Sequence, residues 1–299
     1  MPNTVYHYCS LDSFYNIIKN SNIRLSDIDM SNDYSERKLF KKITSQMINE
    51  KKKAAQIFTS SLKKDGHSFV FCLSSGKDLL SQWRGYANDG TGISIGFDFK
   101  TLNKINEHNV PIFKFLDVIY DKKIQLDLLS SSVDKAISIL ERSKVENPDN
   151  IPNKVSDTFY SWWGEIENCN LRFKGSMFSE EKEWRICLSC PDYTYYESMI
   201  NRYNIYYRKY DTSPVLPAYP RISKENRNLT VSNILTTCLN NKIVSYVDCF
   251  FSDIKDVLIR EIVLGPKCNM NPDEIKNFLH LSGYKLEKIK ISKSKVTYR

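Results

Sequence analysis

The sequence lacks any long apolar run: nothing in it approaches the roughly 18 to 20 residues that a helix needs to cross a bilayer. The N-terminus also lacks the basic and then apolar pattern of a secretory signal peptide. Hydrophobic residues nevertheless make up 41% of the 299 residues and aromatic residues 12%, which is enough for a buried core. These features predict a folded globular protein of the cytoplasm, with no membrane partner.

The eight cysteines do not have the arrangement of a disulfide framework. They lie mostly within apolar stretches, as Cys72 does between Phe71 and Leu73, and this indicates buried thiols. Cys187 and Cys190 have the spacing of half a zinc site, but no second cysteine pair or nearby histidine completes four ligands. We therefore predict no metal site.

The formal net charge of +8 comes from 43 basic and 35 acidic residues. This moderate excess favours an anionic partner, of which nucleic acid is the first candidate. Basic residues are densest over 285–299, where Glu287 is the only acid, and we take Lys293 and Lys295 as candidate nucleic-acid contacts. An exposed edge strand whose lysines prevent aggregation explains the same residues at least as well.

Alternating and helical hydrophobic patterns follow one another along the whole chain without internal repeats or low-complexity segments. Strands are expected at residues 4–8, 23–25, 68–74, 93–97, 113–120, 184–188, 260–264 and 284–292. Helices are expected after Ser10, after Asn32-Asp33, over 78–86, 126–144 and 155–173, and from Pro272. The strand at 93–97 alternates so as to bury one face. We predict one α+β domain over residues 1–299, with a helical insertion at about 124–173.

Glu181 and Glu183 form a Glu-x-Glu motif directly before an expected strand. In an extended segment residues two apart face the same side, so both carboxylates would point into one pocket while Lys182 points away. Two adjacent carboxylates raise the pKa of one of them, which provides an acid or a base with a shared proton. A solvated strand end is the commoner explanation of an isolated motif of this kind.

His7 is one of only four histidines and lies between Tyr6 and Tyr8 in a strand-like segment. A histidine on a rigid strand is suited to hydrogen bonding with sugar hydroxyls, although a structural histidine inside a sheet is an equal alternative. Trp83 and Tyr86 lie in a short helix where aromatic groups meet a polar turn, which suits stacking against a flat ring. For Trp83 the helical spacing favours a place in the core.

Residues 202–210 interleave four tyrosines with three basic residues. Tyr206, Tyr207, Arg208 and Lys209 form the centre of this block, and they suit stacking of unpaired bases beside backbone phosphates. The alternative, a β-prone segment whose tyrosines pack on the domain, is slightly favoured.

The order of several short motifs resembles a bacterial family described as a domain of unknown function, DUF2971. These motifs are Tyr6-His7-Tyr8, Asn32-Asp33 with Glu36, Phe71-Cys72-Leu73-Ser74, Gln82-Trp83-Arg84-Gly85-Tyr86, Gly92-Ile93-Ser94-Ile95-Gly96-Phe97 and Glu181-Lys182-Glu183-Trp184-Arg185. The resemblance spans most of the chain. That family in turn resembles the ADP-ribosyltransferase fold, in which a split sheet grips NAD through a histidine or arginine, a serine or tyrosine, and a glutamate on successive core strands.

The resemblance implies that NAD is the substrate and that His7 binds its ribose hydroxyls. It implies that Glu183, assisted by Glu181, orients the ribose and promotes attack, because cleavage of the nicotinamide–ribose bond builds positive charge on the sugar. The middle position is left open between Ser74 and Tyr86. Tyr8 and Trp83 complete the expected NAD contacts.

Small bacterial enzymes of this fold resemble toxins of toxin–antitoxin and phage-defence systems. The resemblance therefore implies a mono-ADP-ribosyltransferase toxin, with an RNA or DNA acceptor, single-stranded RNA being favoured, and an antitoxin protein as partner. One alternative is hydrolysis of NAD with water as the acceptor. Another is a non-catalytic module that binds nucleic acid or a protein through the basic tail and the tyrosine block.

Overall fold

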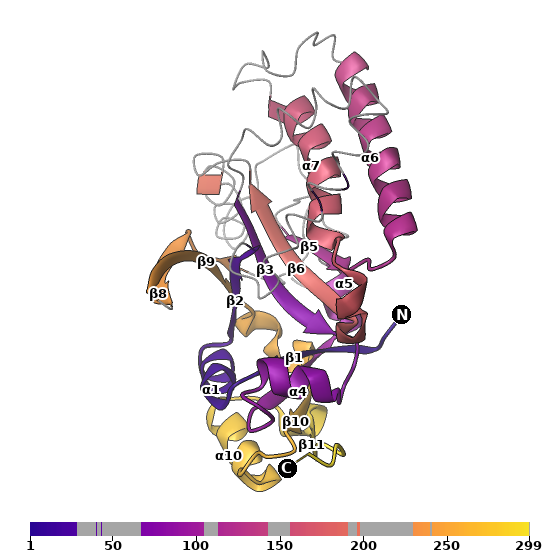
Figure 1. Cartoon of the computed structure of the whole chain (residues 1–299). Coiled ribbons are helices and arrows are strands. Elements are labelled where there is room, and N and C mark those ends of the chain that lie inside the picture. The colour runs from indigo at the N-terminus through magenta and orange to yellow at the C-terminus, as the bar shows by residue number, and fades with distance from the viewer. Residues whose placement is uncertain are drawn as a thin grey trace.

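The computed structural model describes residues 1–28, 40, 43, 67–104, 113–142, 156–190, 196–197, 230–239 and 241–298. These residues form a single open sheet with helices around it, which confirms the α+β class (Figure 1). The strands are β1 (Thr4–Cys9), β2 (Asn22–Asp27), β3 (His67–Ser74), β4 (Ile93–Asp98), β5 (Phe113–Asp117), β6 (Glu183–Cys190), β7 (Thr230–Val231), β8 (Leu235–Leu239), β9 (Lys242–Phe250), β10 (Ile259–Leu264) and β11 (Lys290–Lys293). The α-helices are α1 (Leu11–Asn20), α4 (Leu80–Tyr86), α5 (Phe99–Asn103), α6 (Lys122–Arg142), α7 (Ser156–Arg172), α9 (Lys255–Leu258) and α10 (Pro272–Leu281), and the 3-10 helices are η4 (Ser176–Glu181), η6 (Ser252–Ile254) and η7 (Leu286–Lys288).

The sheet has the strand order β11-β10-β4-β1-β3-β2-β9-β7, with β6 and β5 branching from β3 and β8 from β9. Neighbouring strands are antiparallel except for β10 and β11. The branch at β3 arises because two strands share one of its edges: β1 pairs only at Ser74, and β2 only at Phe69 and Val70. Between these pairs, residues 71–73 have no strand partner on that edge among the described residues. We call this gap in the pairing along one edge of β3, between β1 and β2, the split.

Local sequence signals account for the first elements. The side chain of Ser10 accepts a hydrogen bond from the Ser13 backbone and caps α1, as predicted. Phe14 and Ile18 are buried on its inner face. The helix ends at Ser21, whose left-handed backbone turns the chain into β2. The same logic holds at α10, where Asn271 forms a capping box with the helix.

The prediction that β4 buries one face is wrong, since both faces are buried. Ile95 lies in the main core, beneath α1, α5 and α9. On the other face Ser94 pairs with Tyr8 and Val263, which belong to a cluster with Trp83 of α4. A helix covers the side that the alternating pattern had assigned to solvent.

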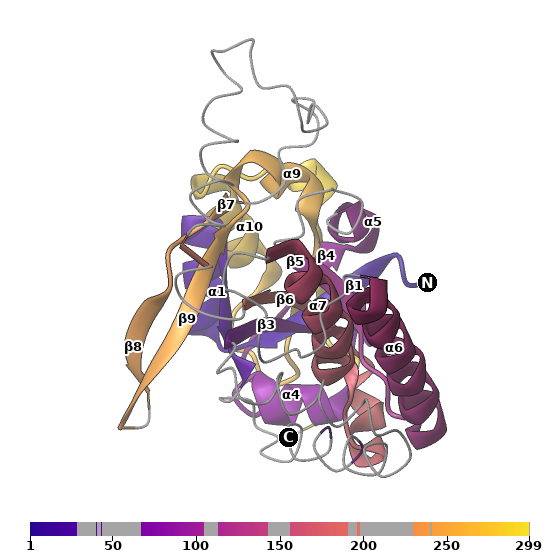
Figure 2. The same cartoon turned by 90° about the horizontal axis from the view of Figure 1, so that it is seen from above.

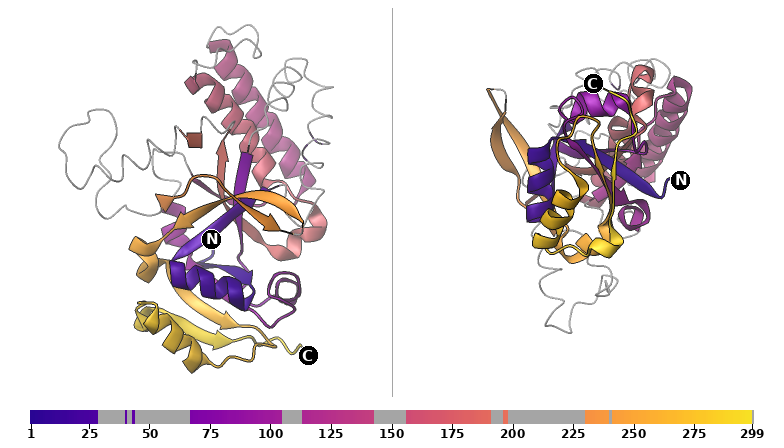
Figure 3. Two further views of the ribbon diagram at one scale, coloured as in Figure 1. Left: turned by 90° about the vertical axis from the view of Figure 1, so that its left-hand side faces the viewer. Right: turned by 90° about the horizontal axis from the view of Figure 1, so that it is seen from below.

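Two pairs of elements project from the sheet. Helices α6 and α7, which lie close to the range predicted as a helical insertion, pack against each other (Figure 2). They lie at the end of the molecule away from the C-terminus (Figure 1). Strands β8 and β9 form a hairpin that extends sideways from the body (Figure 3). Strands β7, β8 and β9 were not predicted from the sequence. Among the described residues, no helix combines the length and the apolar composition that a membrane crossing requires.

Several strands have other boundaries in the structure than those predicted from the sequence. The strand expected at 113–120 ends at Asp117, and the strand expected at 284–292 is confined to Lys290–Lys293 because η7 precedes it. The helix expected after Asn32-Asp33 and the tyrosine block at 202–210 lie outside the described residues.

Candidate functional site

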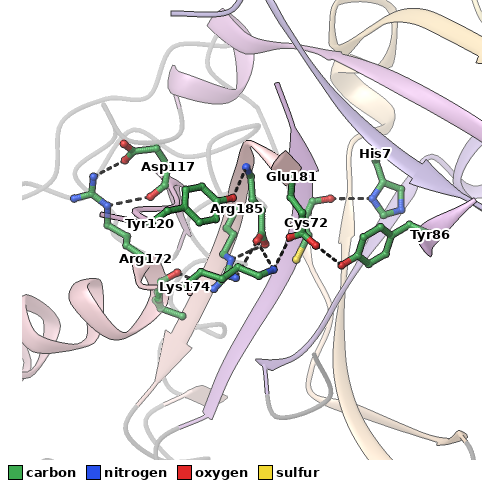
Figure 4. A network of polar contacts seen from close by, with 11 residues as sticks. His7, Cys72, Tyr86, Asp117, Tyr120, Arg172, Lys174, Glu181 and Arg185 are labelled. Atoms are coloured by element: carbon green, nitrogen blue, oxygen red, sulfur yellow. Dashed lines mark hydrogen bonds and ion pairs between the residues drawn. The ribbon is translucent and has the colours of Figure 1, made fainter. Parts of the chain in front are cut away.

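A cavity of about 240 Å³ lies at the split in the sheet. It is lined by Tyr6, His7, Tyr8, Arg24, Ser26, Asp27, Val70, Phe71, Cys72, Leu73, Gln82, Tyr86, Lys174, Phe178, Glu181, Glu183 and Arg185. These residues come from β1, β2, β3, α4, η4 and β6, and from the segment between α7 and η4. The fold thus brings His7 and both glutamates of the Glu-x-Glu motif to one cavity. Figure 4 shows the polar network along its wall.

His7 reaches from β1 across the split to β3. Its Nδ1 lies 2.9 Å from the carbonyl oxygen of Cys72, one of the backbone groups that the split leaves without a strand partner. Because a carbonyl only accepts, the imidazole holds its proton on Nδ1. Burial lowers the pKa of His7 to about 4, although the Cys72 bond opposes this shift. His7 is therefore neutral at pH 7, with Nε2 as a hydrogen-bond acceptor.

Glu183 begins β6 inside a buried group of charges. Arg185 Nε donates to its Oε1 at 2.7 Å and Arg185 Nη2 to its Oε2 at 3.1 Å. Lys174 Nζ donates to the same Oε2 at 2.9 Å. Burial alone would raise the pKa of Glu183, but the charges and hydrogen bonds of Arg185 and Lys174 outweigh it and lower the pKa to about 2. Glu183 thus stays ionised, so the raised pKa expected for one of the two carboxylates does not belong to Glu183.

Glu181 reaches the cavity by a different route from the one predicted. It ends η4 instead of lying in a strand, and Lys182 follows with a left-handed backbone at φ 47° before β6 begins. The two carboxylates nevertheless meet, because Lys174 Nζ also donates to Glu181 Oε2 at 2.6 Å. A lysine bridge joins them, where the prediction had relied on strand alternation.

Of the two candidates for the middle position, only Tyr86 lines the cavity. It is the last residue of α4, and its hydroxyl donates to Glu181 Oε1 at 2.9 Å. Ser74 is buried, and its hydroxyl donates to the Glu181 carbonyl oxygen at 2.6 Å. Ser74 therefore fixes the turn that presents Glu181, while Tyr86 contacts the carboxylate itself.

Tyr8 and Trp83, the other expected NAD contacts, have different positions. Tyr8 lines the cavity, but its hydroxyl is engaged by the Gly76 carbonyl at 2.8 Å and the Leu79 amide at 3.1 Å. Trp83 is fully buried in the core, with its Nε1 donating to Asp78 at 2.6 Å. Its helical spacing had favoured the core, so its assignment as an NAD contact is corrected.

Three further cavity residues were not predicted from the sequence, namely Lys174, Arg185 and Arg24. Arg185 could have been found, because it follows Glu183 by two positions on the same strand face. Lys174 has no comparable signal, since it lies just after α7 and approaches the glutamates only through the packing of that helix end.

The predicted nucleic-acid contacts do not line the cavity. Lys293 is exposed on β11, which forms one edge of the sheet, and Lys295 is exposed just beyond it. This arrangement agrees with the alternative of an edge strand rich in lysine. Tyr206, Tyr207, Arg208 and Lys209 lie outside the described residues. Within the described ranges, no three histidine, cysteine, aspartate or glutamate side chains are placed to hold a metal ion.

The model of a protein family of unknown function, DUF2971, matches residues 82–186. This segment of the chain is therefore similar to the DUF2971 family. The family resemblance expected from the motifs is confirmed over these residues, a shorter stretch than the resemblance expected across most of the chain. The DUF2971 segment includes Tyr86, Lys174, both glutamates and Arg185, so it contributes one wall of the cavity, while His7 comes from outside it. No curated protein and no solved structure matches the chain.

Proposed function

We propose that this protein is an NAD-dependent mono-ADP-ribosyltransferase whose sheet contains an ADP-ribosyltransferase-like split core. The observation that supports this most directly is a single cavity, at the split, lined by a neutral histidine and two carboxylates. The acceptor is a nucleic acid, with single-stranded RNA favoured, and the basic net charge of +8 supports an anionic acceptor.

In this proposal His7 holds the ribose. With its proton on Nδ1, its Nε2 accepts a hydrogen bond from a ribose hydroxyl of NAD. The pKa of about 4 keeps the ring in this form throughout the physiological range. The ring also rests on Phe71, at 4.2 Å between centroids, which fixes its orientation.

The two glutamates have separate roles. An ionised carboxylate accepts about four hydrogen bonds, and Glu183 already accepts three from Arg185 and Lys174. Glu183 therefore supplies a permanent negative charge beside the ribose as positive charge develops there. Among the described residues the carboxylate of Glu181 accepts two hydrogen bonds, from Tyr86 and Lys174, and so has more capacity to meet a substrate group.

The reaction then proceeds by substitution at the ribose. The bond from nicotinamide to ribose C1′ breaks, and nicotinamide leaves with the electron pair. An oxygen or nitrogen of the acceptor forms a bond to C1′ and loses its proton to Glu181. With water as acceptor the same steps give free ADP-ribose.

We further propose that this activity arrests growth in a toxin–antitoxin or anti-phage system and that an antitoxin protein restrains it. The role is supported by the resemblance of DUF2971 to the ADP-ribosyltransferase fold, because small bacterial enzymes of that fold resemble toxins of such systems. An adjacent reading frame encoding an inhibitor would support it further.

The test is incubation of purified protein with NAD labelled on the adenylate and with RNA, DNA and protein in separate reactions. We expect label on RNA, and a loss of at least about 100-fold in rate for Glu183→Gln, the range seen when a transition-state contact is removed. Glu180→Gln is the matched control, because Glu180 is exposed and outside the cavity.

Other outcomes distinguish the alternatives. Free ADP-ribose without labelled acceptor would identify an NAD hydrolase. RNA binding without NAD consumption, lost when Lys293 and Lys295 are neutralised, would identify a binding module. Transfer to no acceptor, with Glu183→Gln equal to the wild type, would contradict the proposal.

A further inference from the structure

Three cationic side chains line the cavity among the residues that the structure describes, and two of them bind carboxylates. Lys174 bridges Glu181 and Glu183, and Arg185 makes two hydrogen bonds to Glu183 and one to the Leu171 carbonyl. The formal charges of these four groups, two positive and two negative, sum to zero. A dinucleotide carries a diphosphate with two negative charges, and this neutral cluster offers it no free cation.

Arg24 is the third cation and has a different environment. It lies on β2, on the opposite side of β3 from β6. Its Nε contacts Asp248 Oδ1 at a long 3.4 Å, and its guanidinium carbon lies 3.7 Å from the centroid of the Tyr246 ring. Half of the side chain is exposed, at 50%. In the part of the chain that the structure describes, no acceptor bonds its two terminal nitrogens.

This geometry is suited to an anion. The guanidinium of Arg24 lies over the ring of Tyr246 in a cation–π contact, and Asp248 contacts it only at Nε. Its two terminal nitrogens, Nη1 and Nη2, therefore present two parallel N–H donors, which is the arrangement that binds phosphate oxygens in pairs. A guanidinium held in this way loses little conformational entropy when it binds.

The register of the sheet places Arg24 at a useful separation from the glutamates. Ser26 pairs with Val70, so Arg24 is at the level of Cys72 along β3, and Cys72 pairs with Arg185 on β6. Arg24 lies two residues beyond the last β2–β3 pair, where the strands have separated, so the backbones of Arg24 and Arg185 are at least two strand spacings, about 10 Å, apart. In NAD the diphosphate is attached to the ribose whose C1′ reacts, so it lies one sugar ring from the reacting bond.

We propose that Arg24 binds the diphosphate of the dinucleotide and thereby sets the direction in which NAD lies in the cavity. This inference rests on the proposed function for its ligand class. In this arrangement the nicotinamide ribose lies between His7 and the glutamates, and the diphosphate extends across β3 to β2. The adenosine half then follows toward β9.

The experiment is calorimetric titration of the full chain with ADP-ribose, comparing the wild type with Arg24→Gln, Arg24→Lys and the control Arg84→Gln. Arg84 is an exposed arginine of α4 that does not line the cavity. We expect Arg24→Gln to weaken binding by about 10- to 100-fold, as for loss of a charge-assisted bidentate contact. Arg24→Lys, which keeps the charge without the planar fork, should be intermediate, and Arg84→Gln should match the wild type.

Thermal melts establish that each variant is folded, and Arg24→Lys preserves the test if the glutamine variant is not. No ADP-ribose binding by the wild type, or equal affinities for all four proteins, would overturn the inference. The proposed function fails separately. If Arg24→Gln weakens ADP-ribose binding but the wild type releases no nicotinamide from NAD, the proposed enzymatic activity is wrong and the diphosphate contact stands. If the wild type cleaves NAD but Arg24→Gln binds ADP-ribose as tightly as the wild type, the activity stands and the diphosphate contact is wrong.

Discussion

At the scale of single residues, the cavity depends on a buried group of four charges. Lys174 and Arg185 neutralise Glu181 and Glu183, so no net charge is buried. Removing one partner of such a group leaves an uncompensated charge and costs about 3–5 kcal/mol. Alanine at position 183 would also leave a cavity and no acceptor for Arg185 and Lys174, which would confuse loss of folding with loss of activity. Glutamine removes the same charge but keeps the shape and one acceptor oxygen, so it is the better substitution, and each variant must be shown to fold.

The pKa values of His7 and Glu183 predict how stability depends on pH. The pKa of His7 falls from 6.5 in the unfolded chain to about 4 in the fold, so the unfolded state binds more protons between these values. Above pH 6.5 the imidazole is neutral in both states and costs no stability. As the pH falls toward 4 the unfolded chain binds a proton that the folded protein does not, so the free energy of unfolding decreases. The pKa of Glu183, lowered from 4.5 to about 2, adds a second loss below pH 4.5.

Urea denaturation at pH 7, 5.5 and 4 measures this dependence. We expect the wild type to lose stability steadily over this range and His7→Gln to lose much less between pH 6.5 and 4.5. His67→Gln is the control, because His67 begins β3 away from the cavity. An equal pH dependence for the wild type and His7→Gln would show that His7 is not held neutral.

Several residues that line the cavity could be predicted from the sequence, but their local backbone conformations could not. His7 and the two glutamates were identified by their motifs, and they line one cavity. The turn at Lys182 was missed because nothing in a lysine signals a left-handed backbone, which tertiary contacts impose. Here those contacts are the hydrogen bonds from Ser74 and Ser75 to residues 181 and 182.

At the scale of elements, the C-terminal segment after β11 holds α4 in place. Asp78, just before this helix, accepts hydrogen bonds from the Ser294 hydroxyl at 2.6 Å and the Lys295 amide at 2.7 Å. It also accepts from the indole of Trp83, within the helix, at 2.6 Å. Since α4 positions Tyr86 at the cavity, this contact connects the end of the chain to the site.

We expect Asp78→Ala to speed amide hydrogen exchange across residues 80–86, because it leaves three donors without their acceptor. The cost in stability should be about 1–3 kcal/mol, the penalty for unsatisfied buried partners. Exchange mass spectrometry on the α4 peptide measures this, with the exposed Asp127→Ala on α6 as control. Unchanged protection of α4 in Asp78→Ala would show that the C-terminal segment does not hold the helix.

Elements with a strong local signal were predicted well, and those that depend on distant pairing were not. The capping residues Ser10 and Asn271 fixed the starts of α1 and α10. By contrast, β8 is exposed on both faces and shows no alternation to detect. β9 takes its place from pairing with β2, which is far away in the sequence, as the Arg24–Asp248 contact illustrates.

At the scale of the whole molecule, the split in the sheet is what creates the site. β1 and β2 each pair with only part of one edge of β3, and the cavity occupies the space between them. The α+β class followed from the mixture of periodicities. The split itself could not be predicted from the residues, because the hydrophobic pattern of a strand specifies its faces and not its neighbours.

Nicotinamide release from NAD at neutral pH tests the central claim most directly, because both the transferase and the hydrolase require it. The account predicts release by the wild type and a decrease of about 100-fold or more in Glu183→Gln and Glu181→Gln, with Glu180→Gln unchanged. Circular dichroism confirms that each variant is folded. No release with any acceptor, or release by a folded Glu183→Gln at the wild-type rate, would contradict the account.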